Sequence, residues 1–227
     1  MKTRIIFLFI LLLMVNIALI AQAPEWLWAA QAGGSSTEAG SGIITDNAGS
    51  IYVTGSFYST ATFGSYSITS AGGFDIFVAK MDATGNWLWA VSAGASEWDF
   101  GCEITVDATG NSYVTGNFQG TATFGSYSIT SAGDDDIFVA KMGNSGNWLW
   151  VTQAGGTDGD GGVGITIDDT GNSYVTGRFQ GTAIFGSFTQ TSSGADDIFV
   201  ARWMQMETVN GLQKQEEVVG IMDLKSQ

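Results

Sequence analysis

Short runs of alternating apolar and polar residues, separated by glycine-containing turns, follow one another along most of the chain. Residues 43–46 are predicted to form one such strand, and residues 51–57 form a run rich in β-branched and aromatic side chains. Between them, residues 47–49 form a turn in which glycine supplies a positive φ. Further runs of strand character lie at 75–81 and 87–90. The pattern predicts short antiparallel strands joined by tight turns, and no stretch has a helical period.

This order of strands and turns recurs with a period of 61 residues, as the positions of Trp26, Trp87 and Trp148 show. Residues 62–69 add a short predicted hairpin to the unit. A strict period of this length indicates one supersecondary unit stacked on itself, and four short strands suit one blade of a β-propeller. We therefore predict an all-β fold, a partial β-propeller of about three four-stranded blades that forms an open arc. The predicted repeats within residues 24–202 span 26–86, 87–147 and 148–202.

Each copy carries a Trp-Leu-Trp motif, as at 87–89. On a regular strand the two indole rings fall on one face, because side chains alternate with period two. Packing of that face against the next blade is the favoured interpretation. The alternative is a row of exposed tryptophans that stack on sugars, which we would expect in one or two copies rather than in all of them.

Three linked motifs recur in the region 26–202, namely D-x-x-G-N-x-Y-V-T-G, D-I-F-V-A-K-M and G-N-W-L-W. Together they resemble the SBBP (β-propeller) repeats of secreted bacterial proteins. The resemblance implies a propeller fold and an extracytoplasmic location. The family offers no shared catalytic residues that could be transferred to this chain.

The formal net charge of −14, with only 8 lysines and arginines, makes nucleic acid an unsuitable partner. The chain has no histidine, which excludes Ser-His-Asp and Cys-His arrangements and histidine-containing zinc sites. Cys102 is the only cysteine, so no internal disulfide can form. Its repeat equivalents are Ser41 and Val163, which favours a small buried position over a reactive thiol. We predict no cofactor.

Residues 1–23 have the pattern of a secretory signal peptide. Two basic residues are followed by an apolar run over 5–20 and by Ala-Gln-Ala, which resembles a cleavage site. Pro24 is unfavourable for cleavage directly before it, so a cut after Ala21 is an alternative. The other interpretation is an uncleaved membrane anchor. The favoured interpretation predicts a secreted or cell-surface protein with no membrane span once the signal is removed.

The carboxylates fall into two groups. Three columns recur in the repeats, consisting of Glu38, Asp99 and Asp160, of Asp46, Asp107 and Asp168, and of Asp75, Asp136 and Asp197. A residue present in every blade is most simply a turn-former whose side chain accepts hydrogen bonds from backbone N–H groups. The carboxylates outside these columns are Glu97, Glu103, Asp134, Asp135, Asp158, Asp169 and Asp196.

Two kinds of chemistry use carboxylates of this sort. A glycosidase needs two of them at a fixed separation, one with a raised pKa, and the sequence does not define that separation. The acidic loop 134–136, with Asp196 and Asp197 one repeat later, has the oxygen atoms that calcium prefers. The spacing of a D-x-D-x-D-G loop is absent, so a solvated acidic loop is the favoured interpretation. We assign no catalytic, cofactor-binding or metal-binding residue.

Residues 203–227 depart from the repeat in mid-blade. A short amphipathic helix that caps the last blade is one interpretation. The favoured one is an out-of-frame fourth repeat, because back-translation in a shifted frame yields a sequence similar to residues 81–105. The third blade then lacks its fourth strand, which residues 26–29 would supply in a closed ring. The open arc is expected to expose apolar blade faces that can self-associate.

The leading functional hypothesis is a secreted, non-enzymatic β-propeller repeat protein, a truncated fragment if the frame is shifted. It would act as a scaffold or interaction module for a protein or glycan. One alternative is an extracellular glycan-binding module that uses aromatic side chains on one propeller face. The other is a carboxylate-based glycan hydrolase or lyase.

Overall fold

The fold is known from a computed structural model, which describes residues 25–203. The predicted signal segment at 1–23 and the tail beyond Trp203 lie outside the described residues. Within residues 25–203 the structure contains strands and turns but no helix, and hence no helix capable of crossing a membrane. The all-β prediction is confirmed.

The main strands form three consecutive antiparallel sheets, which are the blades. Blade one contains β2 (Glu38–Thr45), β3 (Ile51–Phe57), β6 (Asp75–Met81) and β7 (Trp87–Ala93) in that order. Blade two contains β8 (Asp99–Val106), β9 (Ser112–Phe118), β12 (Asp136–Met142) and β13 (Trp148–Gly156). Blade three contains β14 (Gly161–Ile167), β15 (Ser173–Phe179) and β18 (Asp197–Trp203). The third blade has no fourth strand among the described residues, as predicted.

Each copy also carries the predicted outer hairpin. The hairpins are β4 (Thr60–Phe63) with β5 (Tyr66–Thr69), β10 (Thr121–Phe124) with β11 (Tyr127–Thr130), and β16 (Thr182–Phe185) with β17 (Phe188–Thr191). The end of β13 pairs with β16, and Gly94 bridges to Thr123 of β10 in the same way. At the start of the described chain, β1 (Gly33–Gly34) pairs with β4. In blades one and two, the end of the last strand or the residue just after it therefore pairs with the hairpin of the next copy.

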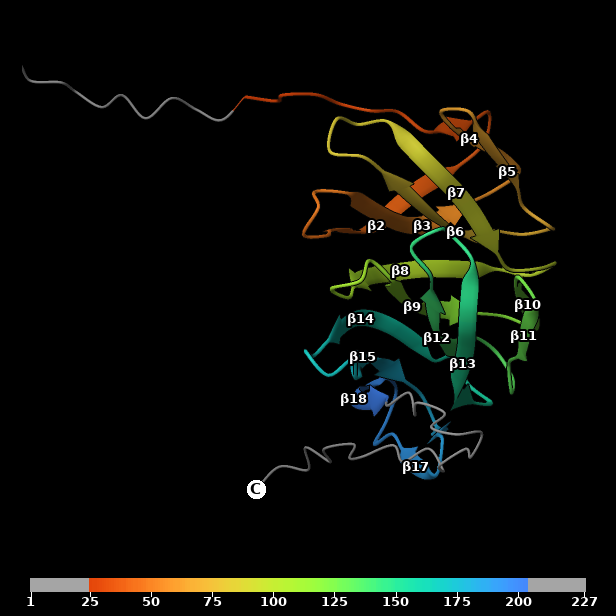
Figure 1. The fold of residues 1–227 in the computed structure, drawn as a ribbon. Coiled ribbons are helices and arrows are strands. Elements are labelled where there is room, and N and C mark those ends of the chain that lie inside the picture. The colour runs from red at the N-terminus through yellow and green to blue at the C-terminus, as the bar shows by residue number, and fades with distance from the viewer. Residues whose placement is uncertain (1–24, 204–227) are drawn as a thin grey trace, which may run out of the picture.

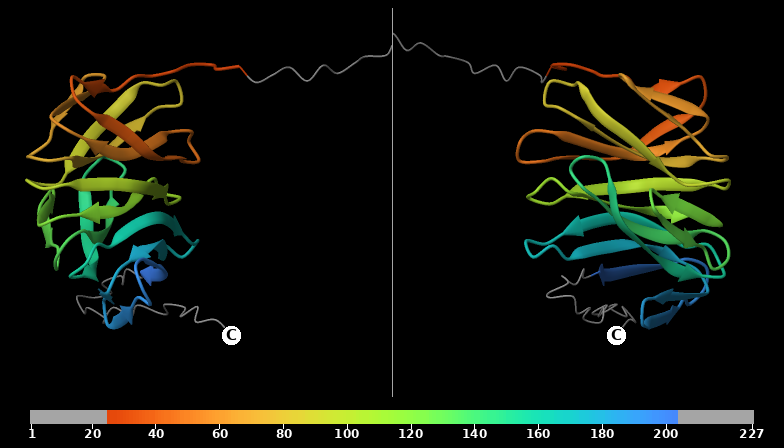
Figure 2. Two further views of the ribbon diagram at one scale, coloured as in Figure 1. Left: turned by 180° about the vertical axis from the view of Figure 1, so that it is seen from behind. Right: turned by 45° about the vertical axis from the view of Figure 1, so that its right-hand side comes forward.

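The blades follow one another in chain order and form an open arc (Figures 1 and 2). Their first strands, β2, β8 and β14, lie next to each other. Residues 26–29 form no strand, and Trp26 and Leu27 are exposed. Trp28 nevertheless lies against Gly85 in the way that Trp89 lies against Gly146 of the following blade. The start of the described chain thus has the position of an outer strand from a preceding blade.

Apolar side chains fill the junctions between the blades. Tyr52, Ile76 and Val78 of blade one pack with Ile104 and Val114 of blade two in one buried cluster. A second cluster joins blades two and three in the same manner. The core of the molecule therefore lies between adjacent blades, and each repeat buries its apolar faces only by stacking on its neighbours.

The prediction that both indoles of the Trp-Leu-Trp motif share one face is wrong. A β-bulge between Lys80 and Met81 shifts the register, so that Trp89 pairs with Lys80 and Trp87 pairs with Met81. Trp89 packs on Tyr52 at the junction with blade two, whereas Trp87 packs on Phe63 of the hairpin in its own copy. Both roles are structural, but only one of the two rings packs against the next blade.

Candidate functional site

The recurring D-x-x-G-N segments build tight turns at one end of the blades. In the second copy, Oδ1 of Asp107 accepts hydrogen bonds from the amides of Thr109 and Asn111, both at 2.9 Å. Gly110 adopts a φ of 81°, which glycine tolerates without strain. Burial acts to raise the pKa of Asp107, but the hydrogen bonds from Thr109 and Asn111 bring it below the usual value. The predicted turn-forming role of this column is confirmed.

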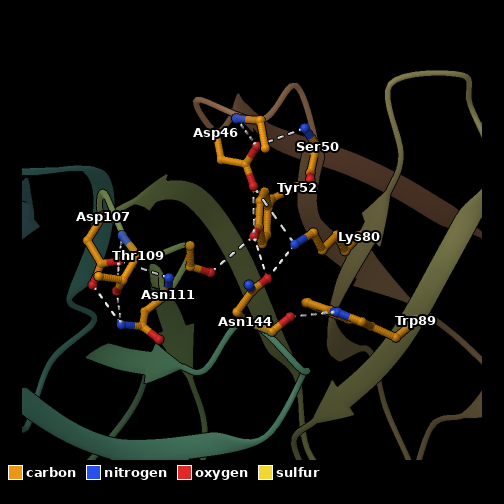
Figure 3. Close-up of polar contacts among 11 residues, drawn as sticks. Asp46, Ser50, Tyr52, Lys80, Trp89, Asp107, Thr109, Asn111 and Asn144 are labelled. Atoms are coloured by element: carbon orange, nitrogen blue, oxygen red, sulfur yellow. Dashed lines mark hydrogen bonds and ion pairs between the residues drawn. The ribbon is translucent and has the colours of Figure 1, made fainter.

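Polar side chains at the first junction join this turn of blade two to blade one (Figure 3). The hydroxyl group of Tyr52 lies 3.0 Å from the main-chain oxygen of Gly110 and 3.1 Å from Oδ1 of Asn144. Nζ of Lys80 donates to the same Asn144 oxygen and lies 3.8 Å from Oδ2 of Asp46. Burial, together with the charge of Asp46, raises the pKa of Tyr52, which stays neutral. This network connects the blades.

A cleft of about 910 Å³ lies at the same end and is bordered by turns of all three blades. Asp46, Asp107 and Asp168 line it together with Lys141 and Tyr113. The pKa values of all three aspartates are lowered, in Asp168 mainly by the hydrogen bond from the Asn172 side chain. The three carboxylates are therefore ionised at neutral pH. Such groups can attract a cation, but they cannot serve as the protonated acid that glycoside hydrolysis requires.

Carboxyls with strongly raised pKa values lie at the opposite end of the strands. Burial raises the pKa of Asp75 to about 6 and that of Asp99 to about 7, with repulsion from Asp75 contributing to the latter. Burial also raises the pKa of Asp136 to about 6. All three are buried side chains, and each accepts a hydrogen bond from the amide four residues earlier. They too are turn-formers, as predicted, and they are not open to a substrate.

The carboxylates outside the columns make separate local contacts. Asp134 accepts from Gln119, Asp135 accepts from Asn117, and Asp196 pairs with Arg178 at 3.0 Å. The others take similar roles: Glu97 and Asp158 accept from neighbouring hydroxyls, Glu103 accepts from the Ile104 amide, and Asp169 lines the cleft. Within residues 25–203 no three acidic or cysteine side chains gather in one group.

Cys102 is partly buried on β8. Burial raises the pKa of its thiol, and the charge of Glu103 adds to the effect. A thiol with a raised pKa is a poor nucleophile at neutral pH. The predicted buried position is wrong for this column, because the equivalent residues Ser41 and Val163 are exposed.

A cluster of four aromatic side chains lies at the first junction, at the end of the strands opposite the cleft. We call Tyr58, Phe74, Trp98 and Phe100 the aromatic cluster. The Phe74 and Phe100 rings stack at 5.6 Å, and Trp98 meets both of them edge-on at 6.3 Å. The Trp98 side chain is 57% exposed and that of Tyr58 is 45% exposed.

Sequence reasoning missed this cluster, although the repeat contains the signal for it. One repeat later, the positions of Tyr58, Phe74, Trp98 and Phe100 hold Gln119, Asp135, Gly159 and Gly161. The aromatic side chains are therefore specific to one junction and are not required by the blade. Only the folded arrangement brings residues from three separate segments together.

Comparison with known proteins agrees with this architecture. The family model described as SBBP, beta-propeller repeat, matches residues 27–56 and 149–178. The chain is 29% identical over 203 residues to "Uncharacterized WD repeat-containing protein L264" of Acanthamoeba polyphaga mimivirus, covering 75% of this chain and 14% of that protein. It is 27% identical over 165 residues to "Regulatory protein FlaEY" of Caulobacter vibrioides, covering 70% and 17% respectively.

The chain thus spans less than a fifth of the length of either relative. The family matches fall at corresponding positions of different copies, each reaching from the Trp-Leu-Trp region into the second strand of a blade. The stacked blades carry the same repeat throughout the described residues. The chain therefore contains β-propeller repeats that match the SBBP model in two of its three copies, and its stacked blades form a repeat scaffold.

Proposed function

We propose that this chain is a secreted, non-enzymatic interaction module whose contact surface is the aromatic cluster. The observation that carries the proposal is the partly exposed Trp98, held edge-on against two stacked phenylalanine rings. Aromatic residues are enriched where proteins bind partners, because they bury a large apolar area with few rotatable bonds. The blades serve as the rigid support that presents this surface.

The distribution of carboxyls supports a role without catalysis. The aspartates that face the cleft have lowered pKa values and remain charged, whereas those with pKa values of 6 to 7 are buried. A glycan hydrolase would need both kinds at one solvent-open site. The proposed extracytoplasmic location rests on the signal-like pattern of residues 1–23.

Photo-crosslinking tests the contact surface. A benzoylphenylalanine in place of Trp98 is compared with one in place of Gly159, which occupies the equivalent position of the next copy. Each purified protein is exposed to the surface of the cells from which the gene comes. We expect a discrete crosslinked partner from position 98 and none from position 159. Equal crosslinking from both positions, or from neither, would contradict the proposal.

A glycan is a second candidate partner, because a flat indole that is 57% exposed can stack on a sugar ring. Trp98→Ala is expected to reduce binding to a glycan array at least tenfold. Trp28→Ala is the matched control, since Trp28 is also partly exposed but lies outside the aromatic cluster. Bound polysaccharide should show no release of reducing ends, whereas such release would favour a hydrolase.

A further inference from the structure

Two aspartates from adjacent blades converge beneath Gly94 at the first blade junction. Asp75 begins β6 in blade one, and Asp99 begins β8 in blade two. A methyl group placed on Gly94 would lie 2.7 Å from Oδ2 of Asp99 and 3.0 Å from Oδ1 of Asp75. The missing side chain of Gly94 therefore leaves room for the two carboxylates to approach the same point.

The pair is buried but incompletely hydrogen-bonded. Asp75 is 3% exposed and Asp99 is 0% exposed. Oδ2 of Asp75 accepts from the Ala71 amide at 3.1 Å, and Oδ2 of Asp99 accepts from the Ala95 amide at 2.9 Å. Oδ1 of Asp75 is buried and has no hydrogen-bond partner among the described residues. A buried carboxylate oxygen with no donor is costly unless something positive lies against it.

No lysine or arginine is among the groups that influence the pKa values of this pair. The charged groups that influence Asp99 are Asp75 and Asp135, both of which repel it. At the second junction, the equivalent pair Asp136 and Asp160 has Arg178 nearby, which opposes the rise in the pKa of Asp160. The residue at the position of Arg178 in the preceding copy is Asn117. Within residues 25–203, no lysine or arginine forms an ion pair with Asp75 or Asp99.

We propose that Asp75 and Asp99 bind a divalent cation between blades one and two, and that calcium fits this site best. Calcium takes carboxylate, backbone and water oxygens in flexible numbers, which suits two carboxylates that come from different strands. With only two charged ligands, the expected Kd is on the order of 10⁻⁴ to 10⁻³ M, in the range of extracellular modules. The cation would neutralise the pair and join the two blades.

The first copy contains half of such a site. Gly33 is the repeat equivalent of Gly94, and Oε2 of Glu38 lies 3.1 Å from the position of a methyl group on Gly33. Oε1 of Glu38 is buried without a hydrogen-bond partner in the described part of the chain. No aspartate within residues 25–203 faces Glu38 across Gly33. A site between blades therefore requires carboxylates from both of them, so we expect no calcium ion beside Glu38 alone.

Terbium luminescence reports on this site directly, because Trp98 precedes Asp99 in the sequence and can sensitise a bound lanthanide. The full chain is titrated with terbium in chelator-treated buffer, and calcium is then added in competition. We expect saturable luminescence that calcium reverses. Asp75→Asn should reduce the signal at least tenfold. Trp98→Phe should abolish the signal, because it removes the indole that sensitises the lanthanide. Gly159 occupies the position of Trp98 at the second junction, so a sensitised signal there is not expected.

Thermal stability provides a second readout that does not require a variant. Calcium at tenfold excess over its Kd is expected to raise the melting temperature by about 3–5 °C. The proposal is overturned if neither calcium nor terbium changes stability or luminescence. It is also overturned if the shift persists in both Asp75→Asn and Asp99→Asn, since binding would then occur elsewhere. Because these readouts need no partner, they are independent of the proposed interaction function.

Discussion

The hydroxyl group of Tyr52 in blade one lies 3.0 Å from the main-chain oxygen of Gly110 in blade two, 58 positions later. The tyrosine recurs in every copy, but this contact depends on how the turn of blade two lies against blade one. The hydroxyl also reaches Asp46 and Asn144, and donates to one acceptor at a time. Tyr52 is fully buried, so its polar group must be satisfied at the junction.

Replacing Tyr52 by phenylalanine should lower the free energy of unfolding by about 1–2 kcal/mol, because Gly110 and Asn144 lose a buried donor. Urea denaturation measures the change. Tyr113→Phe is the matched control, since that hydroxyl is 3.4 Å from Asp107 and forms a weaker hydrogen bond. An equal loss in both variants would show that the bond across the junction contributes nothing specific.

Gly116→Ala should be strongly destabilising. A methyl group at this position would lie 1.9 Å from the main-chain oxygen of Phe100 on the neighbouring strand, so the backbone would have to move. We expect a loss of about 3 kcal/mol or more in the free energy of unfolding, as for overpacked sites. Gly159→Ala is the control, because no atom lies within 4 Å of its added methyl group. A Gly116→Ala protein of normal stability would contradict the close approach of β8 and β9.

Asp107→Ala should cost about 1–2 kcal/mol of unfolding free energy, because the amides of Thr109 and Asn111 lose their shared acceptor. Asp169→Ala is a suitable comparison, since Asp169 is exposed and its equivalent in the second copy is already Ala108. Its effect should stay within about 0.5 kcal/mol. Denaturant-induced unfolding of both proteins tests the difference. An Asp107→Ala protein with an unchanged free energy of unfolding would show that this turn does not stabilise the fold.

Asp136 should make stability fall as the pH rises between about 4 and 6. Burial, with repulsion from Asp160 and Asp135, raises its pKa in the folded state from 3.8 to about 6. The folded protein therefore holds the proton more tightly than the unfolded chain, and this stabilisation is complete below pH 4 and lost above pH 6. The expected size is on the order of 1–2 kcal/mol.

Unfolding by urea at a series of pH values, in buffer free of divalent ions, measures this effect. The difference between wild type and Asp136→Asn isolates it, because Asn does not titrate and the remaining carboxylates are common to both proteins. The wild-type curve should fall relative to that of the variant through the stated window. Parallel curves would show that the pKa of Asp136 is not raised by folding.

Much of the fold could be predicted because the copies of the repeat can be compared with one another. Residues 75–81 were expected to form a strand and are β6, and the expected hairpin at 62–69 lies within β4 and β5. Turn glycines and strand composition are local signals that recur with a strict period, so each copy independently predicts the same strand or turn. The missing strand of the third blade was predicted for the same reason, since the motif stops after Arg202.

The sequence by itself determined the strands, the repeat unit, the stacked all-β architecture and the turn-forming aspartates. Only the tertiary structure decided which residues meet across a junction. A single bulge at Lys80 and Met81 placed the two indoles of one motif on different sides of the blade. The aromatic cluster and the pair formed by Asp75 and Asp99 likewise join segments of different copies. Such contacts depend on how the blades stack, and no local pattern encodes that geometry.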